Sequence, residues 1–536
     1  MPLGWTAAAL LLVALLTVPL AVVAAGAFAP AGEAWAHVAT TLLPEYLLHT
    51  LILVVGAGGL ALVVGVGTAW LVAMCDFPLR RFFHWALVLP LSVPAYMAAY
   101  TYAGMLDVTG PVQRLVRWLG GAGPDTFLYW NVMRIEVLAL IFGFVFYPYV
   151  FLLTRALFEG RSGRALEAAR MLGRGPWSIF LRIALPLARP AVVAGLALVL
   201  MEVLNDYGAA AYYGVTTFTT GIFRSWFAMG DLDTAIRLSA ILMLVVLVVV
   251  GMERWQRGAA RYEEAGGGAP VARYRLRGGA ATAAVAFCFL PLLMGFLLPV
   301  AQLGHWAVRT APQVVDLSFL RLAFNSFALA GGAAALCVGV AVVLAYAGRI
   351  DRTRLTSSAA KLATLGYSIP GAVIAVGVMV AVLGVDRALT GGTALILTGG
   401  LGAMVFAYVV RFMAVGYLSV EAGFTRTGTN LGAASRTLGA SPLRTLFRIE
   451  LPLLRRALLA AGVLVFIDVL KELPLTLILR PFNFDTLATR AFEMASIEQV
   501  PQSAPAALVV IATAASVVAL LHGTFSTEAR PGEEGR

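Results

Sequence analysis

The chain has 536 residues, of which 60% are hydrophobic and 12% are charged, and its formal net charge is +11. A single soluble domain of this length cannot bury so much apolar surface, so the composition excludes that class of protein. Many apolar runs contain no Asp, Glu, Lys or Arg, among them 50–75, 279–304 and 322–348. Each reaches the roughly 17–25 residues that a helix needs to cross a bilayer. We therefore expect an all-α polytopic membrane protein.

The first apolar run, Trp5 to Ala29, lacks a positively charged leading segment and precedes many more spans. It is expected to be a retained helix, not a cleaved signal peptide. About twelve spans are expected in chain order, at 4–28, 47–74, 85–107, 135–154, 190–213, 235–253, 279–302, 323–347, 362–385, 392–415, 457–479 and 504–522.

Arginine is concentrated in two of the loops between these spans. Seven arginines lie in 155–189 and six in 416–456, whereas 29–46 has neither Lys nor Arg. The positive-inside rule predicts that both rich loops and both termini lie in the cytoplasm, as in a multi-pass protein of a bacterial inner membrane. The net charge is then explained by these arginine-rich cytoplasmic loops. Membrane lipid is expected as a partner, and a nucleic acid is not.

The sequence repeats itself at a shift of 266 residues. The segment "EAARMLGRGPWSIFLRIALPLARPA" from residue 167 matches "AASRTLGASPLRTLFRIELPLLRRA" from residue 433 at 12 of 25 positions. Both copies are expected on the same membrane side, so the repeat is parallel. The predicted organisation is a first half at 1–252, a cytoplasmic linker at 253–278, a second half at 279–524 and a cytoplasmic tail at 525–536.

Each repeated loop, about 155–189 and about 417–456, is predicted to form two short helices joined by a glycine turn. Alanine-rich sequence favours the first helix, and Gly173 with Gly175-Pro176 ends it before a second helix that runs to Pro186. Two such compact knobs suit a symmetric partner such as an ATPase dimer. The alternative is that both are ordinary loops stiffened for folding.

These loops resemble the EAA motif of permease subunits of ABC importers, in which the loop couples to a nucleotide-binding subunit. The resemblance implies coupling roles for Glu167, Ala168, Ala169, Gly173, Pro186, Ala433, Ala434, Gly439 and Pro452. The second loop departs from the motif because Ala433 stands where Glu167 stands in the first. No G-x-x-x-x-G-K-[ST] motif occurs, so ATP and Mg are expected on the partner ATPase and no cofactor on this chain.

The span after each knob carries charged or polar residues, which are costly in a bilayer and are candidates for a translocation pathway. They are Glu202, Asn205 and Asp206 in the first half, and Asp468, Lys471 and Glu472 in the second. Their i, i+3, i+4 spacing predicts one helix face in each half. The two faces would form a net negative pathway suited to a hard cation. Alternatively, Lys471 neutralises a neighbouring acid and the acids brace a kinked helix near Pro474.

The stretches 202–231 and 471–496 are similar to those of fused, two-half ferric iron permeases, which take Fe(III) from a periplasmic binding protein. At the same shift Thr220 matches Thr486, and Arg224 matches Arg490. The resemblance places the two arginines where the binding protein would dock. The five histidines are scattered and the three cysteines lack a CxxC spacing, so the sequence identifies no metal ligands.

The sequence leaves other cargoes open. Related permeases serve thiamine, sulfate, polyamines or phosphonates, and a polyamine would also suit the four acids. A proton-coupled secondary transporter could use the same acids as a relay, but it would not need paired knobs. A receptor or scaffold would not explain charges at matched positions in both halves.

Overall fold

The computed structural model describes residues 2–30, 33–120, 131–160, 169–257, 273–351, 353–391, 393 and 395–528. Helices dominate these ranges, as the composition predicts. Their one sheet has two short parallel strands, β1 (Cys75–Asp76) and β2 (Tyr274–Arg275). The expected all-α membrane fold is confirmed.

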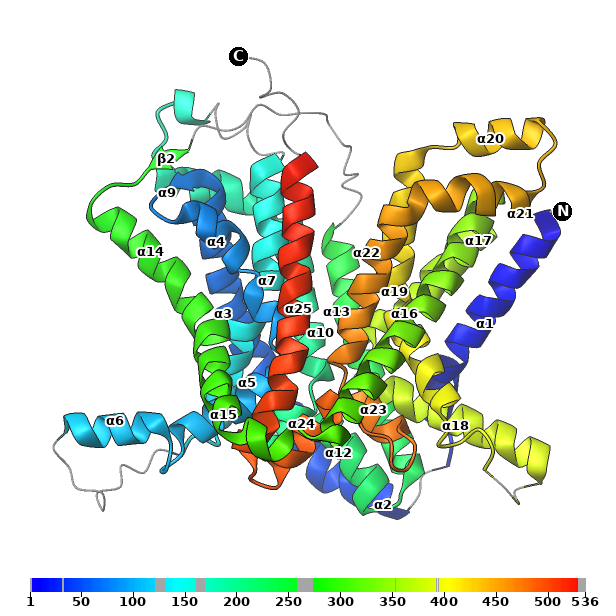
Figure 1. Ribbon diagram of the computed structural model, residues 1–536, viewed down its shortest axis with the longest axis horizontal. Coiled ribbons are helices and arrows are strands. Elements are labelled where there is room, and N and C mark those ends of the chain that lie inside the picture. The colour runs from blue at the N-terminus through cyan, green and yellow to red at the C-terminus, as the bar shows by residue number, and fades with distance from the viewer. Residues whose placement is uncertain are drawn as a thin grey trace. The chain divides into compact units, whose positions relative to one another are not determined.

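Packing divides the chain into two compact units (Figure 1). Unit 1 comprises Met1–Val38, Ile222–Leu244 and Val315–Arg490, and unit 2 comprises Ala39–Gly221, Val245–Val314 and Ala491–Arg536. Four elements cross from one unit to the other: η1 (Val38–Leu42), α12 (Phe218–Phe223), α13 (Leu232–Arg257) and α24 (Leu487–Ser496).

Unit 2 is built around α3 (Leu43–Met74), which packs along α7 (Ile135–Gly160), and around α10 (Leu185–Asn205), which packs on both. In Figure 1, β2 and α9 lie at one end of this unit, and α6 lies at the other end. Its remaining elements are α4 (Arg80–Ala86), η2 (Leu89–Ser92), α5 (Ala95–Leu106), α6 (Pro111–Leu119), α9 (Pro176–Ile179), η3 (Phe180–Ala184), α11 (Gly208–Tyr212), α14 (Gly279–Leu292), η5 (Leu293–Leu297), α15 (Leu298–Val314) and α25 (Val500–Glu528).

Unit 1 has a corresponding centre, in which α16 (Leu317–Ile350) packs against α19 (Leu401–Thr427) and α22 (Leu451–Leu470). Its remaining elements are α1 (Pro2–Gly26), α2 (Glu33–His37), η4 (Arg224–Ala228), α17 (Arg354–Ala363), η6 (Thr364–Ser368), α18 (Gly371–Thr390), α20 (Asn430–Thr437), α21 (Pro442–Thr445), η7 (Leu446–Glu450) and α23 (Pro474–Leu479).

The units are interleaved along the chain. Helix α1, from the first half of the sequence, packs on α16, α17 and α18 of the second half. The approach is close, since a Cβ at Gly377 would lie 2.4 Å from the Pro19 carbonyl oxygen. Conversely, α14 and α15 pack on first-half helices, and α15 also packs on α25. The repeat predicts a division of the chain at 253–278. By packing, however, α1 belongs to unit 1 with most second-half helices, and α14, α15 and α25 belong to unit 2 with most first-half helices.

Among the described residues, ten helices are long and apolar enough to span a membrane, or eleven if one bent pair counts as a span. The bent pair, Arg80–Ser92 with Ala95–Leu119, turns through 89° and replaces the straight span expected at 85–107. The expected span at 457–479 is instead α22 followed by α23. Helix α22 is not among the ten candidate spans, because its 20 residues include three charged ones, Arg455, Arg456 and Asp468.

Candidate functional site

The first repeated loop ends its leading helix with a Schellman turn. The Gly173 N–H donates to the Arg170 carbonyl (2.9 Å), and the Arg174 N–H donates to the Ala169 carbonyl (3.2 Å). Gly173 has φ +74°, a conformation that costs a residue with a Cβ about 1–2 kcal/mol. Ala169 is buried beneath the turn. Glu167 and Ala168 lie outside the described residues.

The second loop forms the same turn with equivalent backbone hydrogen bonds. The Gly439 N–H donates to the Arg436 carbonyl (3.0 Å), and the Ala440 N–H donates to the Ser435 carbonyl (3.1 Å). Gly439 has φ +86°. Ala433 and Ala434 lie on α20 with exposed side chains. The predicted pair of glycine turns is therefore present, with the same backbone hydrogen bonds at a shift of 266 residues.

The segments after the turns also match. Helix α9 and helix α21 both begin at a proline, and each runs into a π-helical stretch, η3 or η7. Pro186 and Pro452 then lie in the first turn of α10 and α22, directly after the π-helical stretches. We call residues 169–184 the first knob and 430–450 the second knob.

Both knobs expose large apolar side chains. In the first knob Met171 is 91% exposed and Leu172 is 82% exposed, and in the second Leu438 is 88% exposed. Trp177 and Leu443 are also exposed. Clusters of exposed apolar side chains of this size are typical of surfaces that bind another protein.

The two knobs are attached to their units by different contacts, which the repeat does not predict. In the first, the Arg170 Nε donates to the Tyr274 hydroxyl (2.9 Å), and its guanidinium lies 3.9 Å from the centre of that ring. Tyr274 belongs to β2, so the strand after the linker supports the first knob. No sequence signal marks this tyrosine, because the contact joins residues far apart in the chain.

The second knob is held by a buried ion pair. The Arg349 Nε lies 3.4 Å from the Glu450 Oε1, and Arg349 also donates to the carbonyls of Phe424 (2.9 Å) and Gly428. Burial raises the pKa of the Glu450 carboxyl above its usual value, and Arg349 and Arg436 oppose that shift. One arginine thus joins the end of α16, the end of α19 and η7 beneath α20.

The first charged trio lies at a break between two helices. Helix α10 ends at Asn205, and the Asp206 carboxylate accepts the backbone N–H groups of Ala209 (2.9 Å) and Ala210 (3.1 Å) at the start of α11. Glu202 accepts the Tyr149 hydroxyl at 3.2 Å. The prediction of one continuous helix face is wrong here, because Asp206 leaves the helix to cap the next one.

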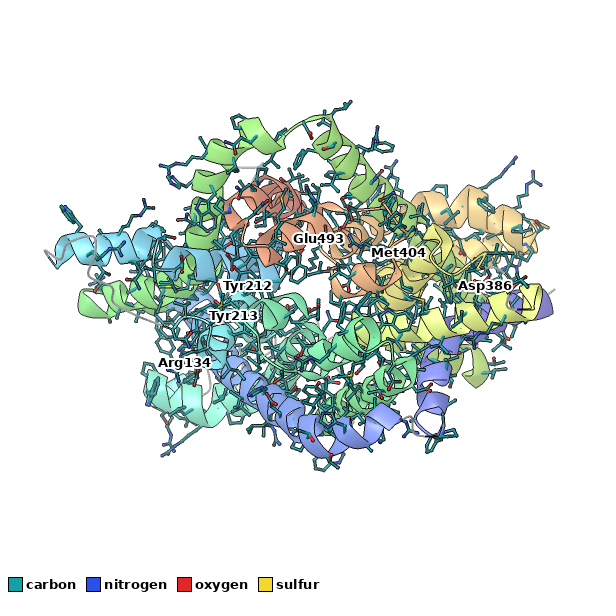
Figure 2. The ribbon with its side chains drawn as sticks, turned by 90° about the horizontal axis from the view of Figure 1, so that it is seen from below. Arg134, Tyr212, Tyr213, Asp386, Met404 and Glu493 are labelled. Carbon is teal, nitrogen blue, oxygen red and sulfur yellow. The ribbon has the colours of Figure 1, made fainter. Side chains whose placement is uncertain are left out.

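Helix α11 then packs on α5. It ends at Tyr212, and the following residue, Tyr213, is nearly buried (Figure 2). The Tyr213 hydroxyl donates to the Ala99 carbonyl of α5 at 3.3 Å, and the Tyr212 ring lies 6.2 Å from that of Tyr100. These contacts hold the first break against a neighbouring helix of unit 2.

The second trio lies at the equivalent break. Helix α22 ends at Leu470, and the Lys471 Nζ lies 2.9 Å from the Asp468 Oδ1. Glu472 accepts the Leu475 N–H at 3.3 Å, at the start of α23. The single-face prediction is wrong for this trio as well. The alternative interpretation, that Lys471 neutralises an acid and an acid braces the kink, describes these contacts correctly.

An arginine that the sequence analysis missed changes the charge of the second break. The Arg411 Nε lies 3.8 Å from the Glu472 Oε2, and both residues are buried, at 5% and 7% exposed. The pairs Lys471–Asp468 and Arg411–Glu472 leave this break without net charge. At the same shift of 266 residues, the first half has Val145 in place of Arg411. Of the two breaks, the first is therefore the one whose carboxyl groups, Glu202 and Asp206, have no basic partner among the described residues.

The proposed match of Arg224 with Arg490 is wrong in register. In one half the Thr217 N–H donates to the Thr220 hydroxyl (2.7 Å), and in the other the Thr486 N–H donates to the Thr489 hydroxyl (2.9 Å). These equivalent helix starts are 269 residues apart, so Thr220 corresponds to Thr489. Arg224 then corresponds to Glu493, which Figure 2 labels, and Arg490 to Gly221. Both arginines are exposed.

Among the described residues, no group of three or more His, Cys, Asp or Glu side chains could hold a metal ion. Cys75, Cys288 and Cys337 are free and buried.

Comparison with known proteins identifies relatives for both halves. A family described as the binding-protein-dependent transport system inner membrane component matches residues 8–257 and 338–526. The chain is 26% identical over 475 residues to the Fe(3+)-transport system permease protein FbpB 2 of Haemophilus influenzae, covering 88% of each chain. It is 28% identical over 210 residues to the molybdenum transport system permease protein ModB of Escherichia coli, covering 38% of this chain and 87% of the relative.

A third relative, the sulfate transport system permease protein CysT of Escherichia coli, is 26% identical over 159 residues, 28% of this chain and 51% of its own. The family match includes both knobs and both helix breaks, and the apolar helices are those of a multi-pass protein. The chain therefore belongs to the family of binding-protein-dependent transport system inner membrane components, the permease subunits of ABC importers.

Proposed function

We propose that this chain is the transmembrane subunit of an importer for ferric iron, driven by a separate ATPase dimer that binds the two knobs. The observation that carries the coupling is the repetition of one glycine turn with exposed apolar side chains, once in each unit. A symmetric ATPase pair needs two equivalent docking points. Family membership also excludes the proton-coupled alternative, since the matched family works with a binding protein.

The orientation follows from this proposal. If an ATPase binds the knobs, they lie in the cytoplasm, as the arginine content of both loops predicts. Both termini would then also be cytoplasmic, and a periplasmic binding protein would approach from the other side, where Arg224 and Arg490 are candidates for its contact. ATP binding would draw the ATPase subunits together and favour one state of the permease, and hydrolysis would release it.

The proposal of ferric iron rests on similarity and on charge. The relative that transports Fe(3+) is matched over 88% of both chains, so the likeness includes the fused two-half organisation. The first break contributes Glu202 and Asp206, whose oxygen atoms suit a hard cation. We propose that this break and the second break, with Asp468, Lys471 and Glu472, contribute to one translocation pathway.

An oxyanion such as molybdate is the second candidate, because permeases described as serving molybdenum and sulfate are also similar to this chain. The charges argue against it. The positive groups at the second break, Lys471 and Arg411, are each paired with a carboxylate. An anion would gain no uncompensated positive charge from them and would be repelled by Glu202.

The test is uptake of radiolabelled ferric iron by cells that lack this chain, with and without its restoration. We expect restoration by the wild type and loss with Leu172→Ser/Leu438→Ser, because the apolar docking contacts are removed. The matched control is Leu119→Ser, a leucine on α6 that is 69% exposed at the opposite end of unit 2 from β2. Each protein must reach the membrane in equal amount.

This design tests the proposed cargo and the proposed coupling to the ATPase separately. Iron uptake that never depends on the chain would contradict the cargo, and parallel assays with molybdate, sulfate, thiamine and a polyamine would then identify another. Uptake that survives in the double variant would contradict docking at the knobs. Equal loss in Leu119→Ser would show that any exposed leucine matters and would also contradict it.

A further inference from the structure

Unit 2 has a cavity surrounded by arginine side chains that neither the repeat nor the helix breaks explain. Its volume is about 660 Å³. It is lined by Asp76, Phe77, Leu79, Arg80, Arg81, Arg273 and Arg275, and we call it the arginine pocket. Four positive groups face one carboxylate, so the pocket carries an excess of three positive charges among its lining residues.

Three features fix the backbone of the pocket. The pairing of β1 with β2 places Asp76 beside Arg275. The Arg80 Nη1 donates to the Val72 carbonyl (2.9 Å), and the Arg273 Nε donates to the Ala73 carbonyl (3.3 Å). Two of the arginines therefore complete the C-terminal end of α3, where carbonyl groups lack helical partners. Their remaining N–H groups are available to a ligand.

Arg81, Arg273 and Arg275 are exposed, and Arg80 is partly exposed. Within the part of the chain that the structure describes, none of the four pocket arginines has a carboxylate within ion-pair distance. Asp76 and Glu159 act electrostatically on Arg80, and Glu159 also acts on Arg273, so two carboxylates offset part of the repulsion among the four arginines. A bound anion would offset the rest. A guanidinium also presents paired donors that match the oxygen atoms of a phosphate group.

The position of the pocket identifies the source of that phosphate. Three helices begin or end around it: α3 ends at Met74, α4 begins at Arg80, and α14 begins at Gly279. Helices α3 and α14 lie in segments long enough to span a bilayer, so the pocket lies at the depth where a span leaves the hydrocarbon core. Lipid headgroups occupy that depth.

Apolar side chains next to the arginines support the same depth. Leu79 lines the pocket with its side chain 62% exposed and with φ +62°, and Phe82 is 40% exposed. The Phe82 and Trp85 rings meet edge to face at 5.7 Å. A left-handed leucine is strained, and such strain is retained where the surroundings require it. Exposed aromatic side chains beside arginines are typical of a membrane interface.

We propose that the arginine pocket binds the phosphate of an anionic phospholipid headgroup. The guanidinium groups of Arg81 and Arg275 hold the phosphate oxygens, and Leu79 and Phe82 contact the acyl chains. Arg80 and Arg273 add positive charge from their positions against the end of α3. Only the choice of leaflet, the cytoplasmic one, rests on the proposed function. The pocket itself does not depend on the cargo.

The test measures lipid bound to the purified full-length chain in detergent by native mass spectrometry. Phosphatidylglycerol is the probe, and zwitterionic phosphatidylcholine is the reference lipid. We expect preferential binding of phosphatidylglycerol by the wild type. Arg81→Gln/Arg275→Gln should weaken it by about 25-fold, since each basic residue at a membrane surface contributes about fivefold. Neither side chain has a hydrogen bond within the described structure, so the variant should fold.

The matched control is Arg277→Gln, an exposed arginine two residues from Arg275 that does not line the pocket. Its binding should stay within about twofold of the wild type. Equal phosphatidylglycerol binding by the wild type and the double variant would overturn the site. Equal weakening in Arg277→Gln would also overturn it, because it would indicate general surface charge.

A second arm separates the two sources of phosphate. Inorganic phosphate at millimolar concentration should displace little phosphatidylglycerol if the acyl chains contribute to binding. Complete displacement would overturn the lipid as the occupant and assign the pocket to a soluble phosphate compound. None of these measurements uses uptake, so the pocket and the proposed transport function can fail independently.

Discussion

Glu472 and Asp468 both have a basic partner at the second helix break, but their surroundings differ. Arg411 and Glu472 have side chains only 7% exposed, whereas Lys471 and Asp468 are 27% and 19% exposed. Removing one member of a buried pair leaves an uncompensated charge and costs about 3–5 kcal/mol. Losing a more accessible pair costs about 1 kcal/mol or less. Burial, not the number of charges, decides which residue holds this break together.

We therefore expect Arg411→Met to destabilise the protein far more than Lys471→Met. Arg411 also donates to the Ile369 carbonyl, so its loss leaves a second buried group without that partner. The measurement is thermal unfolding of the purified protein in detergent. Arg411→Met/Glu472→Gln should recover part of the stability, because no buried carboxylate is left unpaired. Equal losses for the two single variants would contradict this assignment.

At the scale of the element, the two knobs share one backbone turn but differ in what supports them. Tyr274 of β2 supports the first, and the Arg349–Glu450 pair supports the second. The first half has Ala184 where the second has Glu450, so the ion pair has no counterpart there. The two knobs can therefore be disturbed one at a time.

We expect Arg349→Ala to loosen α20 and η7 while leaving the first knob unchanged, because Arg349 joins three elements only in the second half. Hydrogen exchange of backbone amides should rise across 430–450 and stay constant across 169–184. Arg426→Ala, which removes an exposed arginine near the end of α19, is the control and should change neither region. Faster exchange in both knobs would contradict independent support.

Local chemistry explains which elements could be predicted from the sequence. The knobs were predictable because glycine at a left-handed turn and proline at a helix start act within a few residues. The helix breaks could not be predicted. An acidic residue four positions after another fits both a continuing helix and a cap on the next helix. The 269-residue spacing of Thr220 and Thr489 was also missed. The second half has three extra residues between its helix break and Thr486, and a short alignment does not reveal such an insertion.

Long-range partners were beyond such reasoning. Arg349, Arg411 and Tyr274 acquire their roles from segments distant in the chain, and none belongs to a motif. The same limit applies to the packing units. Hydropathy predicts that α1 and α14 are apolar helices, but it does not say on which half each one packs.

At the scale of the whole molecule, both units need segments from both sides of the linker. Unit 1 combines α1 with α16 to α23, and unit 2 combines α3 to α11 with α14, α15 and α25. The linker is thus one covalent connection among many contacts between the sequence halves.

We expect a chain cut by a protease at a site inserted within 258–272 to remain a single particle. The two fragments should co-elute in size-exclusion chromatography in detergent, since each unit is completed by helices from both. An uncut sample of the same protein is the control. Fragments that separate without denaturant would contradict the interleaved packing. Either half expressed alone should yield little stable protein, for the same reason.

The exchange of α1 also determines the order in which the protein can be completed during its synthesis. Helix α1 ends at Gly26, and α16, on which it packs, begins at Leu317. At about 5–20 residues per second, the ribosome needs roughly 15–60 seconds to make the intervening chain. During that interval α1 lies in the bilayer without its neighbour. Unit 1 must therefore assemble late, because α1 stays in the lipid without α16 until more than half of the chain has been made.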